Sequence, residues 1–222
     1  MDIYEITGCR PDVGLDQVMR GLGCAVGSPA YEDMAAEYEE IRKQIPAMVY
    51  PVGILGFSRL PDHLATNRYG TGVPVAMGVL SVGRAMEEES GRQFRQGNYV
   101  KGMLWDAVAN VALFSLEKDL TAALRECCRS RRVGVERRLE APHDISMDVQ
   151  REAWSFLELE KRYGIHITQG NMLDPVKTSC QVFVLTDRED VFRAGHDCKA
   201  CGNLTCQYRK EPGEAKTARQ ES

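Results

Sequence analysis

Residues 72–83 read GVPVAMGVLSVG, a nearly continuous apolar run that is bounded by a glycine at each end. Valine is enriched in β-strands, and a strand that is buried on both faces shows a continuous apolar run rather than an alternating one. A helix is predicted to follow directly at residues 84–96. The stretch therefore predicts a buried strand inside a sheet, with a helix packed beside it.

The rest of the chain adds helices and strands to this strand. Apolar residues recur at helical spacing over residues 28–45, 99–128 and 146–163. Short apolar runs between Gly and Pro residues predict strands at 47–60, 165–168 and 179–186, whereas 129–145 reads as irregular. Asp106 and Asn110 interrupt the apolar face of 99–128, so each is either satisfied in the core or aimed at a ligand. These elements predict an α+β fold with a mixed or antiparallel sheet and long helices.

Composition limits the class of protein. The chain has 222 residues, 43% of them hydrophobic, and a formal net charge of −4. That charge, without a large basic field, argues against a nucleic-acid partner. No secretion signal and no run of about 18 apolar residues occurs, so we expect a cytoplasmic protein without a membrane span.

Four segments are expected along the chain. Residues 1–48 read as an N-terminal arm and helix, and residues 49–188 as the main core. Residues 189–209 form a cysteine-rich segment, and the polar tail 210–222 is expected to be disordered.

Residues 196–206 read HDCKACGNLTC, which places Cys198, Cys201 and Cys206 in the spacing C-x2-C-x4-C. Three thiolates leave one position of a tetrahedral site open, which suits an iron-sulfur cluster with His196 or another group as the fourth ligand. Zinc held by the same three cysteines and His196 is the alternative, and it would be structural. A disulfide with one spare thiol is the third interpretation.

Residues 137–144 read RRLEAPHD and have the chemistry of a binding loop. Arg138 can bind a carboxylate through two parallel hydrogen bonds, or it can form a salt bridge with Glu140 or Asp144. His143 is either a cofactor contact or simply exposed.

Four stretches, in order, resemble the activation domain of cobalamin-dependent methionine synthase in a free-standing form. They are residues 72–80, the helix 99–114 with Asp106, residues 138–150, and residues 164–179. The resemblance implies a domain that binds S-adenosylmethionine over the face of a corrinoid and helps return cob(II)alamin to methylcobalamin. The sequence shows no recognisable cobalamin-binding segment, such as an Asp-x-His-x-x-Gly phrase, so we expect a partner protein to carry the corrinoid.

The resemblance also implies cofactor-binding residues. The family has an Arg followed three residues later by Pro-Gly-Tyr; here Arg138 and Pro142 match with a shift of one residue, and the Gly-Tyr pair is absent. Arg138 is expected to bind the carboxylate of S-adenosylmethionine in a pocket with Pro142 and the turn 174–177. Further expected contacts are His143, Asp106 and Lys177, although a lysine in a turn is usually solvated.

Taken together, these features predict an activator of a corrinoid protein in a methyltransferase system. An iron-sulfur centre at Cys198, Cys201 and Cys206 is expected to deliver an electron, because this segment lies outside the stretches that carry the resemblance. The alternative is a non-enzymatic docking or chaperone subunit with a structural zinc site.

Overall fold

The computed structural model describes residues 2–199, 201, 206 and 208–209. Its centre is a five-stranded sheet in the order β1-β2-β3-β7-β4, and all four strand pairs are antiparallel. In this order the strands are Asp2–Glu5, Val52–Arg59, Pro74–Ser81, Thr178–Thr186 and Gly134–Leu139. Every residue of β3 after Pro74 is buried, so the predicted buried strand is confirmed as the middle of the sheet.

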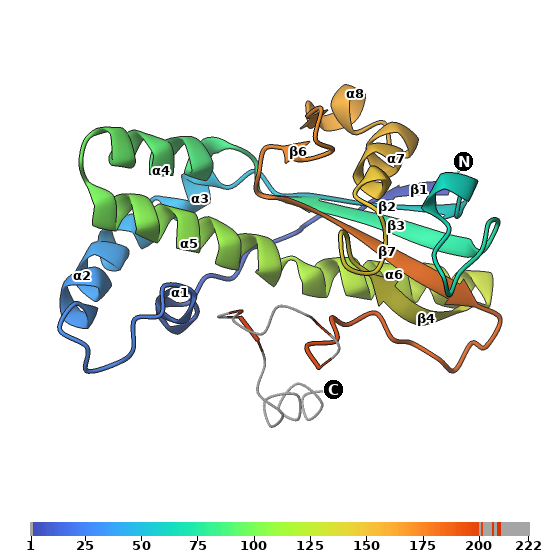
Figure 1. Cartoon of the computed structure of the whole chain (residues 1–222). Coiled ribbons are helices and arrows are strands. Elements are labelled where there is room, and N and C mark those ends of the chain that lie inside the picture. The colour runs from blue at the N-terminus through green and yellow to red at the C-terminus, as the bar shows by residue number, and fades with distance from the viewer. Residues whose placement is uncertain (1, 200, 202–205, 207, 210–222) are drawn as a thin grey trace.

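Helices cover one face of this sheet and build the larger core (Figure 1). Sheet residues such as Leu55 and Phe183 pack there with helical residues such as Trp105 and Leu120, all of them fully buried. The helices that contribute are α1 (Leu15–Gly21), α2 (Tyr31–Arg42), α3 (Ile45–Met48), α4 (Ala85–Arg95), α5 (Tyr99–Ser115) and α6 (Glu117–Arg131).

A second core lies on the opposite face of the sheet. There Met77 and Val184 of the sheet pack with Val149 and Leu157. The elements on this side are α7 (Asp148–Phe156), α8 (Leu159–Tyr163), the short 3-10 helix η1 (Asp62–Leu64), and the two-stranded sheet of β5 (His166–Ile167) and β6 (Leu173–Asp174).

Two strand glycines allow close packing on these faces. A Cβ at Gly78 would lie 2.9 Å from the Leu120 side chain of α6, and one at Gly56 would lie 2.6 Å from Leu157. Both values are shorter than real Cβ contacts, so a side chain at either position would push the covering residues away from the sheet.

Several boundaries differ from the sequence prediction. The helix predicted at 99–128 is two helices that meet at Leu116, and the helix predicted at 146–163 divides at Glu158, whose φ is 53°. Residues 129–145, predicted to be irregular, contain strand β4. The sequence did not predict β4 because its two arginines interrupt the apolar run by which strands were recognised. An edge strand tolerates polar side chains that an inner strand cannot accommodate.

The segment after β7 returns along the outer edge of β4, on the side away from β7 (Figure 1). Val135 of β4 donates its N–H to the Val191 carbonyl at 2.8 Å and accepts from the Arg193 N–H at 2.8 Å. Residues 191–193 therefore behave as a short parallel extension of the sheet. In the part of the chain that the structure describes, no helix is long and apolar enough to cross a membrane.

Candidate functional site

Arg138 projects from edge strand β4, with only 10% of its side chain exposed. Its Nη2 donates to Glu117 Oε1 at 3.0 Å. Its Nε lies 2.6 Å from Glu140 Oε1, an ion-pair contact without hydrogen-bond geometry. A charge this deeply buried needs carboxylate partners, because desolvation would otherwise be very costly. The salt bridge with Glu140, one of the two alternatives that the sequence left open, is therefore present.

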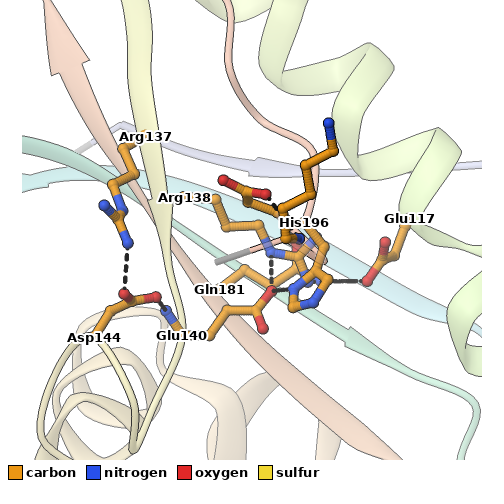
Figure 2. Close-up of polar contacts among 9 residues, drawn as sticks. Glu117, Arg137, Arg138, Glu140, Asp144, Gln181 and His196 are labelled. Carbon is orange, nitrogen blue, oxygen red and sulfur yellow. Dashed lines mark hydrogen bonds and ion pairs between the residues drawn. The ribbon is translucent and has the colours of Figure 1, made fainter. Parts of the chain in front are cut away.

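Arg137 and Arg138 leave β4 on opposite sides (Figure 2). Arg137 Nη2 donates to Asp144 Oδ1 at 2.8 Å, and Asp144 Oδ2 accepts the backbone N–H of Glu140 at 3.2 Å. These two contacts fold the loop 140–144 back against the strand. The binding loop predicted at 137–144 is thus half strand and half loop, with its charged side chains divided between two faces.

Two residues that complete this cluster were missed by the sequence analysis. Glu117 begins α6, and its Oε1 also accepts a hydrogen bond at 3.3 Å from Nε2 of Gln181 on β7. Gln181 is only 3% exposed. A glutamine inside the apolar run of β7 was a usable signal, because a buried amide requires a hydrogen-bond partner.

The cysteine-rich segment reaches the same cluster through His196. Its Nδ1 lies 2.9 Å from Glu140 Oε1, the oxygen that also contacts Arg138 (Figure 2). Glu140 therefore joins β4 to the C-terminal segment. A carboxylate on one ring nitrogen is also the arrangement that orients a histidine to bind a metal through its other nitrogen.

Two adjoining cavities open beside β4. The first has a volume of about 190 Å³, and its lining includes Arg138, His143, Arg193, His196 and Cys201. The second has a volume of about 460 Å³, and its lining includes Tyr69, Leu139, Pro142 and Ile145. Four residues line both cavities, so the two form one groove beside β4; they are Arg68, Arg137, His143 and Asp144.

Asp106 and Lys177 form a separate cluster. Lys177, with 10% of its side chain exposed, donates to Asp106 Oδ1 at 2.7 Å and to Asn110 Oδ1 at 2.8 Å. Asn110 in turn donates to Asp106 Oδ2 at 3.1 Å. The two polar interruptions of the helix 99–128 are thus satisfied by one lysine. Neither of the two cavities beside β4 is lined by a residue of the turn 174–177, so a pocket that this turn shares with Arg138 stays a prediction.

Tyr208 connects this second cluster to the cysteine-rich segment. Its ring lies 4.9 Å from that of Phe114 on α5. Burial raises the pKa of Tyr208, the nearby Asp106 carboxylate raises it further, and a hydrogen bond with Asn110 lowers it. Arg209, the next residue, contacts the backbone of two of the clustered cysteines. Its Nη2 donates to the Cys201 carbonyl at 2.9 Å, and its Nη1 donates to the Cys198 carbonyl.

The three clustered thiols, Cys198, Cys201 and Cys206, are each partly buried. Among the residues that the structure describes, no group of three or more His, Cys, Asp and Glu side chains is arranged to hold a metal ion. Joint metal binding by the thiols and His196 stays a prediction that requires the segment to close around the metal. The disordered tail predicted at 210–222 lies outside the described residues.

Comparison with known proteins identifies the fold. No protein-family model and no curated protein matches the chain. Among solved structures, the chain is similar to a crystal structure of the MetH reactivation domain bound to AdoHcy, with a TM-score of 0.52 and 10% sequence identity. The match covers 88% of this chain and 81% of that chain. The α+β fold implied by the family resemblance, with an antiparallel sheet and long helices, is thereby confirmed.

Proposed function

We propose that this protein reactivates a corrinoid carried by a partner protein and holds S-adenosylmethionine in the groove beside β4. The observation that carries the proposal is the likeness over most of the chain to a reactivation domain whose solved structure contains AdoHcy, which is S-adenosylhomocysteine. The groove adds support, because its lining combines charged side chains, which an amino acid requires, with residues such as Tyr69, Leu139 and Ile145, against which a nucleoside can pack.

The reaction in this proposal consumes one electron and one S-adenosylmethionine for each cob(II)alamin; the cobalamin becomes methylcobalamin and the methyl donor becomes S-adenosylhomocysteine. The protein's own task is to hold the methyl donor against the partner's corrinoid. It can shift the partner toward its reactive conformation only by binding that conformation more tightly than the resting one. The reaction would take place in the cytoplasm.

The cysteine-rich segment is the part of the proposal that lies outside the family resemblance. An iron-sulfur cluster at Cys198, Cys201 and Cys206 would supply the electron. His196 and Cys201 already line the charged cavity, so a centre in this segment would adjoin the bound methyl donor.

A docking subunit with a structural zinc site is the second candidate. It is favoured by the Glu140–His196 contact, because a carboxylate that fixes the histidine ring is common at zinc sites. Metal analysis of anaerobically purified protein, together with its visible spectrum, separates the two candidates.

The test of the main proposal mixes the protein with a corrinoid protein from the same organism under a mild reductant. The cob(II)alamin absorption band is followed with and without S-adenosylmethionine. We expect the protein to accelerate loss of the band, and Cys201→Ser to abolish the acceleration while the fold is retained. Full activity of Cys201→Ser would give the thiols a structural role. No acceleration by the wild type would favour the docking subunit.

A further inference from the structure

The charged cavity contains one arginine whose side chain is not paired. Arg68 lies 3.1 Å from Glu136, Arg137 pairs with Asp144, and Arg138 is held by both Glu117 and Glu140. Arg193 lines the same cavity and is exposed, and no described residue pairs with its guanidinium. A ligand that enters the cavity therefore meets Arg193 as the cation with free hydrogen-bond donors.

Arg138 is poorly suited to bind a ligand carboxylate in this arrangement. Its Nε and Nη2 form one of the two guanidinium edges that bind a carboxylate in parallel, and each atom already faces a different carboxylate of the chain itself. A ligand at this edge would have to displace Glu117 or Glu140 and leave that carboxylate without its cation. Such a displacement is unfavourable at a site this deeply buried.

The backbone of Arg193 is held in place by its neighbours. Its N–H donates to the Val135 carbonyl of β4, and Phe192 forms an isolated bridge with Val135. The guanidinium of Arg125 lies 3.9 Å from the centre of the Phe192 ring, and Ala194 is only 2% exposed. Arg193 thus presents an exposed side chain from a backbone that is already held, so binding does not have to order this segment.

The composition of the cavity wall indicates the class of ligand. Glu140 and Asp197 line the cavity together with Arg193, so both charge signs are present. A zwitterionic amino acid matches such a wall better than a phosphate does, because acidic side chains repel a second anion. The guanidinium matches the planar carboxylate, whereas the acidic side chains match the ammonium group.

We infer that Arg193, rather than Arg138, binds the α-carboxylate of the S-adenosylmethionine-type ligand. Arg138 then serves as a positioning residue that fixes Glu140 and Glu117 at the wall of the cavity. The inference rests on the proposed function, since it assigns a residue to the amino-acid end of that ligand.

The test compares two ligands that differ in the amino-acid portion. S-adenosylhomocysteine carries the carboxylate, whereas 5′-methylthioadenosine keeps the thioether nucleoside and lacks the amino acid. Calorimetry measures both with the wild type, Arg193→Gln, Arg193→Lys and the control Arg132→Gln. Arg132 is a surface arginine like Arg193, but it pairs with Glu189, its side chain is 83% exposed, and it does not line the cavity.

We expect Arg193→Gln to weaken S-adenosylhomocysteine binding by about 10- to 100-fold, the range for lost charge-assisted hydrogen bonds. Binding of 5′-methylthioadenosine is expected to stay unchanged, Arg193→Lys to recover part of the loss, and Arg132→Gln to behave as the wild type. Thermal unfolding checks that each variant is folded.

Two results would overturn the inference, and they are distinguishable. If the wild type binds S-adenosylhomocysteine and Arg193→Gln binds it equally well, or loses both ligands equally, the carboxylate is held elsewhere and only the inference fails. If the wild type does not bind S-adenosylhomocysteine, the proposed methyl-donor site fails and the role of Arg193 fails with it.

Discussion

Two buried cations, Arg138 and Lys177, tie different segments of the chain together. Arg138 connects strand β4 to the first residue of α6 and to the loop that follows β4. Lys177 connects the start of β7 to Asp106 and Asn110 of α5. In both cases the side chain loses its water and gains carboxylate or amide oxygens, so removal of either partner leaves a polar group unsatisfied.

Lys177→Met tests whether this lysine is structural. Methionine keeps the length of the side chain but cannot donate to Asp106 or Asn110. We expect the free energy of unfolding to fall by about 1–2 kcal/mol, because half-exposed Asp106 can regain water in the variant. Urea denaturation measures the change.

Lys161→Met is the matched control. Lys161 is 81% exposed and lies 3.5 Å from Glu158, so its loss should change stability by less than about 0.5 kcal/mol. Unchanged stability in Lys177→Met, together with weaker S-adenosylhomocysteine binding, would instead make Lys177 a ligand contact.

At the scale of elements, edge strand β4 and the segment 191–193 position the charged cavity. Gly134, the first residue of β4, lies where the turn 188–191 crosses closest to the strand. A Cβ at this position would overlap the backbone carbonyl oxygens of Arg188 and Val191. Backbone atoms cannot rotate away as a flexible side chain can, so the turn would have to move.

Gly134→Ala should therefore destabilise the protein by about 1–3 kcal/mol, the usual cost of overpacking. It should also weaken S-adenosylhomocysteine binding, because displacement of the turn moves Arg193. Gly91→Ala in the middle of α4 is the control. Its Cβ would meet only the flexible end of Arg95, and alanine in a helix is favoured by up to about 1 kcal/mol. Equal effects of the two changes in a thermal unfolding series would contradict the close approach at Gly134.

At the scale of the whole molecule, the eight cysteines are distributed unevenly. Cys9 and Cys128 lie in the larger core, Cys180 lies in the middle of the sheet, and three thiols gather on the C-terminal segment. Burial raises the pKa of Cys128 to about 11. It raises the pKa of Cys180 to about 12, since this thiol is desolvated although the residue as a whole is partly exposed.

Labelling of native protein with N-ethylmaleimide at pH 7.5 should follow this distribution. The thiolate reacts, and a pKa raised above that of an ordinary cysteine leaves little thiolate at this pH, so Cys128 and Cys180 should remain unlabelled. Their rates should rise about tenfold per pH unit up to the raised pKa. Peptide mass spectrometry reports each site.

Anaerobic loading with zinc, or with iron and sulfide, should then protect Cys198, Cys201 and Cys206 together. Partly buried Cys24 is the internal control, because it is not one of the three clustered thiols and its Sγ is 3.2 Å from Ser28 Oγ. Protection of fewer than all three clustered thiols, or equal protection of Cys24, would contradict a joint metal centre.

The amino-acid sequence by itself determined the regular elements that are apolar. The run 72–83 predicted β3 and the helical spacing around it predicted the covering helices, because burial in the core demands apolar side chains at fixed periods. It also marked Asp106 and Asn110 as polar residues on an apolar helix face that needed partners, and it grouped three thiols by their spacing.

The tertiary structure alone decided which polar residues meet. Strand β4 was hidden because its arginines find carboxylates that are distant in the sequence, such as Glu117 on α6. Arg193 gained its place beside the cavity only because residues 191–193 return along the edge of β4. Apolar burial produces a periodic pattern in the sequence, whereas ion pairs between distant segments produce no pattern. Any acidic side chain can pair with any basic one, and only the folded structure determines which two lie close together.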